Sequence, residues 1–123
     1  MNKINYFYTT LSVNENFNPM TNVKVPPEGN LTVPIRLLAE VILDEDDSTN
    51  FLYEIILNDT YTVSKGRFEN SFRNRILDGN YTLGIIFDVQ VIHVEANQMS
   101  KFSFNLYKNE QKLDSLETHI IYY

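Results

Sequence analysis

The sequence contains no cysteine and no tryptophan. Without cysteine the chain can form no disulfide, no thiolate metal site and no thiol nucleophile, which fits a reducing compartment. Tryptophan is common in sugar-binding clefts, so its absence argues against a carbohydrate site. Alanine is also rare: there are two, against 15 asparagines and 11 isoleucines, a usage that resembles AT-rich bacterial and phage genes.

Long apolar runs and catalytic fingerprints are missing as well. No stretch approaches the roughly 20 apolar residues that cross a bilayer as a helix. Residues 1–10 alternate polar and aromatic side chains and lack the apolar core of a signal peptide. Nucleophile-elbow, phosphate-loop and dinucleotide-binding motifs do not occur. We therefore expect a cytoplasmic, non-enzymatic protein with no cofactor, no metal and no membrane contact.

The composition is that of one soluble globular domain over residues 1–123. Hydrophobic residues make up 43% of the chain and charged residues 21%, which is typical of folded proteins, and the length is that of a single domain. The formal net charge of −6 repels nucleic acid and anionic lipid. The expected partners are therefore other proteins.

Period-two alternation of apolar and polar residues dominates the chain, and β-branched and aromatic residues are abundant. This pattern predicts strands and no substantial helix. Turn-forming residues fill 14–30, and 67–80 is less regular. We predict an all-β fold, an antiparallel immunoglobulin-like β-sandwich of about seven to eight strands. The main strands are expected at 4–13, 31–43, 51–57, 61–66, 81–94, 101–107 and 112–123.

The strand predicted at 31–43 is the clearest core element. Its odd-numbered residues form an unbroken apolar row that should face inward, and Pro34 should bend or bulge the strand. The strand at 51–57 is expected to pair with it as an antiparallel hairpin. At 101–107, alternation places three apolar residues on one face. These are Phe102, Phe104 and Leu106.

Four segments follow one another in a distinctive order: VPIRLLAEVILDEDD (33–47), LYEIILND (52–59), NYTLGIIFDVQV (80–91) and KFSFNLYKNEQKLDSLETHIIY (101–122). This order resembles an uncharacterised bacterial family of stand-alone immunoglobulin-like β-sandwich domains. In that family a long central strand ends in an acidic or polar hairpin, and two alternating strands close the chain. The resemblance implies an immunoglobulin-like sandwich. It implies no catalytic residue, because the family has no established activity.

Four consecutive carboxylates separate the strands of the predicted hairpin: Asp44, Glu45, Asp46 and Asp47. Their charge equals four of the six net negative charges. Three interpretations are open: a solvated tip that blocks edge pairing, an acidic patch that binds a partner, and a Ca²⁺ site to which Thr49 and Asn50 would add oxygens. The run lacks the alternate spacing and distal glutamate of calcium loops. The solvated tip is therefore favoured, and the partner patch comes next.

A second charged feature, SKGRFENSFRNR (64–75), interleaves basic and aromatic residues. Its four cations are Lys65, Arg67, Arg73 and Arg75. Basic and aromatic side chains together bind single-stranded nucleic acid in other proteins, but Glu69 dilutes the charge and the whole chain is acidic. A loop anchored in the core by Phe68 and Phe72 is favoured. As a binding loop, it would suit an acidic protein surface as well as a nucleic acid.

These features predict a non-enzymatic protein-binding or adaptor sandwich of unknown role. The predicted contact residues are the acidic run 44–47 and the four cations of 64–75. Because the two groups have opposite charge, they would also permit a homo-oligomer. The alternative is a phage- or mobile-element-encoded acidic inhibitor that occupies a basic, nucleic-acid-binding surface of a host protein.

Overall fold

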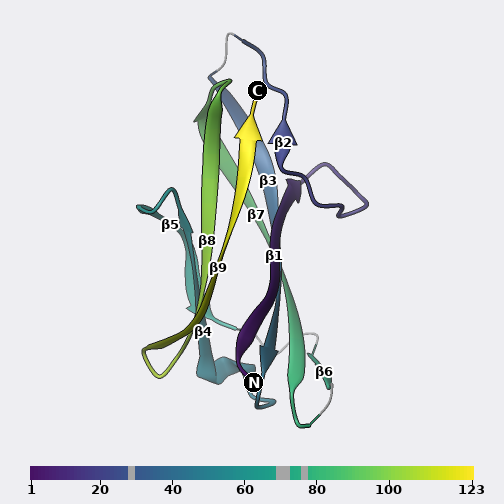
Figure 1. Cartoon of the computed structure of the whole chain (residues 1–123), viewed down its shortest axis with the longest axis vertical. Coiled ribbons are helices and arrows are strands. Elements are labelled where there is room, and N and C mark those ends of the chain that lie inside the picture. Colours follow the sequence, from purple (N-terminus) through teal and green to yellow (C-terminus); the bar gives the residue numbers. More distant parts are fainter. Residues whose placement is uncertain (28–29, 69–72, 76–77) are drawn as a thin grey trace.

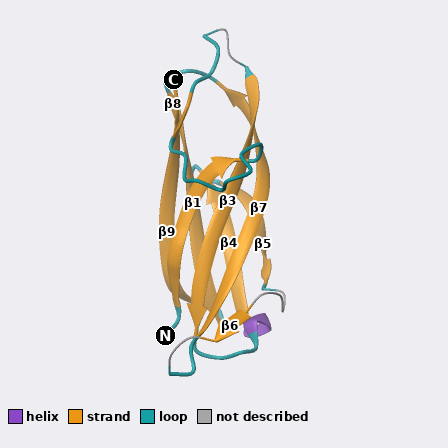
Figure 2. Cartoon of the chain, turned by 90° about the vertical axis from the view of Figure 1, so that its right-hand side faces the viewer, coloured by secondary structure: helices purple, strands orange, loops and turns teal. Residues whose placement is uncertain are grey.

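The computed structural model describes residues 1–27, 30–68, 73–75 and 78–123 and consists of two β-sheets packed face to face (Figure 1 and Figure 2). Sheet A has the strand order β1-β3-β7-β6, and sheet B has the order β2-β9-β8-β4-β5. In sheet A the strands are β1 (Lys3–Leu11), β3 (Leu31–Leu43), β6 (Arg73–Arg75) and β7 (Tyr81–Val94). In sheet B they are β2 (Asn22–Val23), β4 (Phe51–Leu57), β5 (Tyr61–Arg67), β8 (Gln98–Lys108) and β9 (Gln111–Tyr122).

The prediction of an all-β fold is confirmed, and every main strand lies close to its expected bounds. The two short strands β2 and β6 were not predicted, because the sequence predicted turns or irregular structure for the segments that contain them. The described part of the chain therefore holds nine strands, and its single helical turn is the 3-10 turn η1 (Ser48–Asn50). Within these residues no helix is long and apolar enough to span a membrane.

The core lies between the sheets and is formed by the alternating residues of the longest strands. The odd-numbered residues of β3 from Val33 to Leu43 are buried, as the sequence predicted. Leu31 is 39% exposed and departs from the prediction, because the pairing of β3 with β7 shifts register between Leu31 and Val33. From sheet B the predicted apolar row of β8 is fully buried. Burying each such side chain contributes about 1.5–3 kcal/mol.

Pro34 lies inside β3, a central strand of sheet A, which is unusual for proline. Its carbonyl oxygen accepts a 3.1 Å hydrogen bond from the backbone N–H of Ser12. The N–H that proline lacks would point to the same side, and β1 has already ended there at Leu11. The pairing of β3 with β7 therefore loses no hydrogen bond at Pro34, and the register shift lies just before it.

The predicted hairpin between 31–43 and 51–57 is wrong. β3 pairs with β1 and β7 in sheet A, whereas β4 pairs with β5 and β8 in sheet B. Residues 44–50 therefore cross from one sheet to the other, and they are called the crossing connection below. Leu43 and Phe51, at its two ends, are both buried in the core. Two apolar strands joined by a short polar segment are compatible with a hairpin within one sheet and with a crossing between two sheets. The sequence pattern alone therefore did not distinguish the hairpin from the crossing.

Candidate functional site

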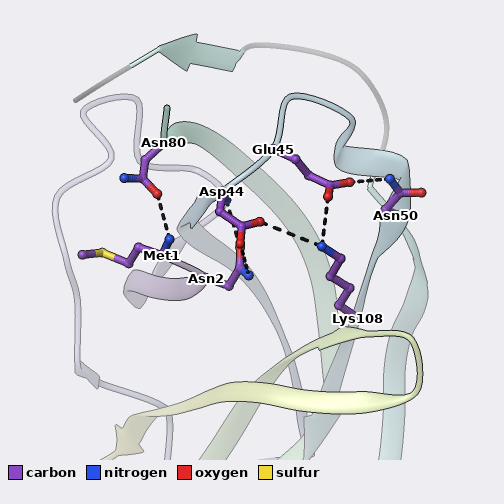
Figure 3. Close-up of polar contacts among 7 residues, drawn as sticks. All are labelled: Met1, Asn2, Asp44, Glu45, Asn50, Asn80 and Lys108. Carbon is purple, nitrogen blue, oxygen red and sulfur yellow. Dashed lines mark hydrogen bonds and ion pairs between the residues drawn. The ribbon is translucent and has the colours of Figure 1, made fainter. Parts of the chain in front are cut away.

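The four carboxylates of the crossing connection lie at the end of the sandwich that holds the N-terminus (Figure 1). The side chain of Lys108, at the end of β8, points into this group (Figure 3). Its Nζ lies 2.9 Å from Glu45 Oε2 and 3.9 Å from Asp44 Oδ1. The same ammonium lies 5.1 Å from the centroid of the Phe51 ring. Lys108 therefore offsets part of the negative charge within the molecule.

Further polar contacts hold the crossing connection in place (Figure 3). Asn2 donates to the carboxylate of Asp44 at 3.0 Å and accepts from the Asp44 backbone N–H at 2.9 Å. Asn50 donates to Glu45. The hydrogen bond from Asn50 and the contact with Lys108 hold the pKa of Glu45 below its ordinary value. Glu45 is thus an anchored carboxylate.

The other two carboxylates differ from each other. Asp47 caps η1, where its carboxylate accepts hydrogen bonds from the backbone N–H and the hydroxyl of Thr49. Asp46 is exposed, and within the described part of the chain its side chain forms no hydrogen bond or ion pair. The run therefore offers less free negative charge than the sequence suggested. Among the described residues, no three His, Asp or Glu side chains are grouped so that they could hold a metal ion.

The four predicted cations do not share one loop, so that prediction is wrong. Lys65 and Arg67 lie in β5, at the edge of sheet B, and Arg73 and Arg75 lie in β6, at the edge of sheet A. The backbone of β6 pairs with residues 81–83 of β7. Phe68 is buried, as expected of a core anchor, with its ring centroid 5.2 Å from that of Tyr53. Phe72 and Glu69 lie outside the described residues.

Lys65 and Arg67 place two exposed cations on the outer face of sheet B. The neighbouring Ser64 points inward, with its hydroxyl 3.2 Å from that of Tyr53, so Lys65 and Arg67 point outward. Glu54 lies opposite Lys65 on β4 and accepts hydrogen bonds from Asn105 and Tyr107. The Arg67 guanidinium donates to the Thr49 carbonyl at 3.0 Å. Within the described residues neither cation forms an ion pair.

The backbone of β5 is paired on one side only. Its single ladder partner in the described chain is β4. Just beyond the strand, the N–H of Phe68 bonds to the Phe51 carbonyl of β4 at 3.3 Å. The backbone N–H and C=O groups of successive residues in a strand point to opposite sides. The backbone groups of Gly66 therefore also point toward β4, whereas those of Lys65 and Arg67 point away from it. Lys65 and Arg67, whose side chains form no ion pair in the described chain, thus also present backbone donors and acceptors without a ladder partner there.

The strands that end the two sheets elsewhere, β1, β2 and β6, are covered or short. β1 ends sheet A, but its Ile4 N–H donates to Asp114 Oδ2 of β9 at 2.8 Å. Farther along β1, the Thr9 carbonyl accepts from the Met20 N–H at 2.7 Å. β2 and β6 have two and three residues. Within the described chain, two edges therefore have an outer side without a ladder partner: β5, and β7 beyond Leu83. Of these two, β5 carries the exposed cations Lys65 and Arg67.

The sequence reasoning missed Lys108 and Asn2, which decide how much of the acidic run is free. Lys108 is separated from Glu45 by 63 residues, and Asn2 from Asp44 by 42. Neither contact has a local signal in the sequence, because Lys108 reaches Glu45 only when the two sheets pack together and Asn2 reaches Asp44 only when β1 pairs with β3. Comparisons with known protein families and with curated proteins find no match to this chain.

Proposed function

We propose that the chain is a non-enzymatic protein-binding domain that takes a strand of its partner onto the free edge of β5. The observation that carries this proposal is the unpaired outer side of β5 at Lys65 and Arg67. A row of unpaired N–H and C=O groups is a template for an added strand. Each backbone hydrogen bond formed there would contribute about 0.5–1.5 kcal/mol.

We also infer that the sandwich is immunoglobulin-like and that the chain is related to the bacterial domains it resembles. The strand orders support this, since an immunoglobulin sandwich puts its first, second, fifth and fourth main strands in one sheet and its seventh, sixth and third in the other. With β2 and β5 as additions, sheets A and B have these orders. Backbone NOEs between Ile55 and Phe104 test the inference. NOEs that paired β4 with β3 would contradict it.

The acidic-inhibitor alternative has less support. It needs a free acidic surface to meet a basic one, and Lys108 already contacts Asp44 and Glu45. Within the run 44–47, Asp46 alone keeps an exposed carboxylate without a described partner. Lys65 and Arg67, by contrast, are exposed, and their cations have no carboxylate within ion-pair distance in the described residues. The positive charge at the outer edge of β5 therefore favours an acidic partner over a basic one.

The test is a peptide selection with an edge-blocked variant. Lys65→Pro removes a donor that faces away from β4, so the β4–β5 ladder keeps its hydrogen bonds. Lys65→Ala is the matched control, because it removes the same charge and leaves the N–H. Random short peptides displayed on phage are selected on the wild-type chain and then assayed on both variants. We expect peptides that bind wild type and Lys65→Ala but not Lys65→Pro. Selected peptides that bind Lys65→Pro equally well would overturn the proposal.

A further inference from the structure

A groove opens between the two sheets beside the free edge of β5. Its volume is 230 Å³, and its floor comes from both sheets. Two of its lining residues, Asp88 and Gln90, are polar, and the rest are apolar or aromatic. The apolar and aromatic lining residues are Leu57, Tyr61, Val63, Val89, Val91 and Phe102.

The core is incompletely covered on this side of the sandwich. β6 pairs with β7 only over residues 81–83, and in the described chain the rest of β7 pairs with β3 alone. The inward residues Ile85, Phe87 and Val89 of β7 are only half-buried. Their direct partners on β3, Ala39, Leu37 and Ile35, are at most 2% exposed. Sheet A therefore has room for apolar side chains supplied from outside.

We infer that the partner strand alternates apolar and acidic residues; this inference rests on the proposed function. A strand that bonds to the backbones of Lys65 and Arg67 has residues directly opposite them, and opposite residues share a face. Acidic side chains at those two positions would pair with the cations on the outer face. The residues between and beside them would point inward, toward the groove and the half-buried side chains of β7. The recognised pattern is apolar–acidic–apolar–acidic–apolar.

A second copy of the chain fits this edge poorly. In an antiparallel pair of two β5 strands, Lys65 and Arg67 of both copies would lie on the same face of the joined sheet. Like charges placed opposite one another are destabilising, and no carboxylate of β5 would separate them. The charge on the edge therefore selects an acidic strand from a different protein.

The test uses three synthetic peptides of equal length with fluorescent labels. The first alternates valine and glutamate, the second alternates valine and lysine, and the third has the composition of the first with its valines and glutamates in separate blocks. Binding is measured by anisotropy on the wild-type chain and on the Lys65→Glu/Arg67→Glu double variant. Thermal unfolding of the variant checks its fold, and both positions are exposed. The charge reversal also removes the hydrogen bond from Arg67 to the Thr49 carbonyl and sets a like charge opposite Glu54, so the unfolding curve is compared with that of the wild type before binding is interpreted.

We expect the alternating glutamate peptide to bind wild type at least about tenfold more tightly than either control, since two surface ion pairs contribute roughly that much. The double variant should prefer the lysine peptide. Equal binding of the glutamate and lysine peptides, lost in Lys65→Pro, would overturn the acidic pattern and leave edge binding intact. If none of the three binds while the phage selection yields edge-dependent peptides, the pattern is wrong. If neither experiment yields edge-dependent binding, the proposed function fails as well.

Discussion

The backbone N–H of Ile4 in β1 donates a 2.8 Å hydrogen bond to the carboxylate of Asp114 in β9. This bond joins sheet A to sheet B along one side of the sandwich, where β1 lies beside β9 (Figure 1). On the opposite side, neither β5 nor the part of β7 beyond Leu83 has an outer partner in the described chain. As far as the described residues go, the sandwich therefore has one closed side and one open side, and the open side carries Lys65 and Arg67.

Asp114→Ala should weaken the closed side. The Ile4 N–H would lose its acceptor in a part-buried position, which costs about 1–3 kcal/mol. Asp114→Asn is the matched control, because its side-chain oxygen can still accept the bond. We expect Asp114→Ala to lower the free energy of urea unfolding and to speed hydrogen exchange at Ile4, and Asp114→Asn to do less of both. Equal stability of wild type and Asp114→Ala would show that this hydrogen bond does not stabilise the contact between β1 and β9.

Acid should loosen the crossing connection through Glu45. Its pKa is lowered in the folded chain by the hydrogen bonds from Asn50 and Lys108, so the unfolded chain binds this proton more readily. The stabilisation is therefore complete above the unfolded pKa of about 4.3 and is lost as the pH falls through the lower folded value. Glu45→Gln should remove this part of the pH dependence in urea titrations between neutral and acid pH.

Asp46→Asn is the control for that titration, since Asp46 lies in the same connection without a described side-chain partner. It controls for the loss of one negative charge from the run 44–47. Asp88, whose pKa is lowered mainly by its hydrogen bond with Arg36, adds a similar acid sensitivity in all three proteins and cancels in the comparison. A Glu45→Gln curve parallel to the wild-type curve at every pH would refute the anchoring role of Glu45.

Ser100 and Tyr122 form a buried hydroxyl pair, 2.8 Å apart, with exposed fractions of 3% and 1%. Removing either hydroxyl leaves the other buried without a hydrogen-bond partner. Ser100→Ala and Tyr122→Phe should therefore each lower the free energy of unfolding by about 1–3 kcal/mol. The double variant should cost less than the sum, because no unpaired hydroxyl is left. Ser103→Ala, on the outer face of β8, is the control. Strictly additive losses in urea unfolding would mean that the two hydroxyls do not depend on each other.

The chain should be a monomer at the concentrations of a binding assay. Lys108 offsets part of the acidic run, and two β5 edges would bring like charges together. Both effects oppose the charge-paired homo-oligomer that the sequence suggested. Light scattering at low and high ionic strength should therefore give one monomeric mass. A dimer that dissociates as salt is added would restore the sequence-based hypothesis.

The strands could be predicted from the sequence because their signal is local. Alternation in 101–107 is enough to place Phe104 inside and Ser103 outside, whatever the neighbouring strands are. The same reasoning placed the inward row of β3 and erred only at Leu31, where a register shift with a distant strand breaks the alternation. β2 and β6 are too short to show a period, so they were missed.

The pairing of strands and the state of the candidate site could not be predicted, because both depend on contacts between distant segments. The pattern around residues 44–47 suits a hairpin and a sheet crossing equally. The four cations are close in sequence, yet β5 and β6 belong to different sheets. Arg36 and Asp88 form an ion pair at 2.8 Å although 52 positions separate them in the sequence. Nothing in their spacing predicts this pair.

Amide hydrogen exchange along β5 tests the open edge most directly. In the free protein, the Lys65 and Arg67 amides should exchange much faster than the Gly66 amide, because only Gly66 faces β4. Adding the alternating valine–glutamate peptide should slow exchange at Lys65 and Arg67 and leave Gly66 unchanged. Lys65 and Arg67 amides that are already protected in the free protein, or that gain no protection when the peptide is bound, would contradict strand addition at this edge.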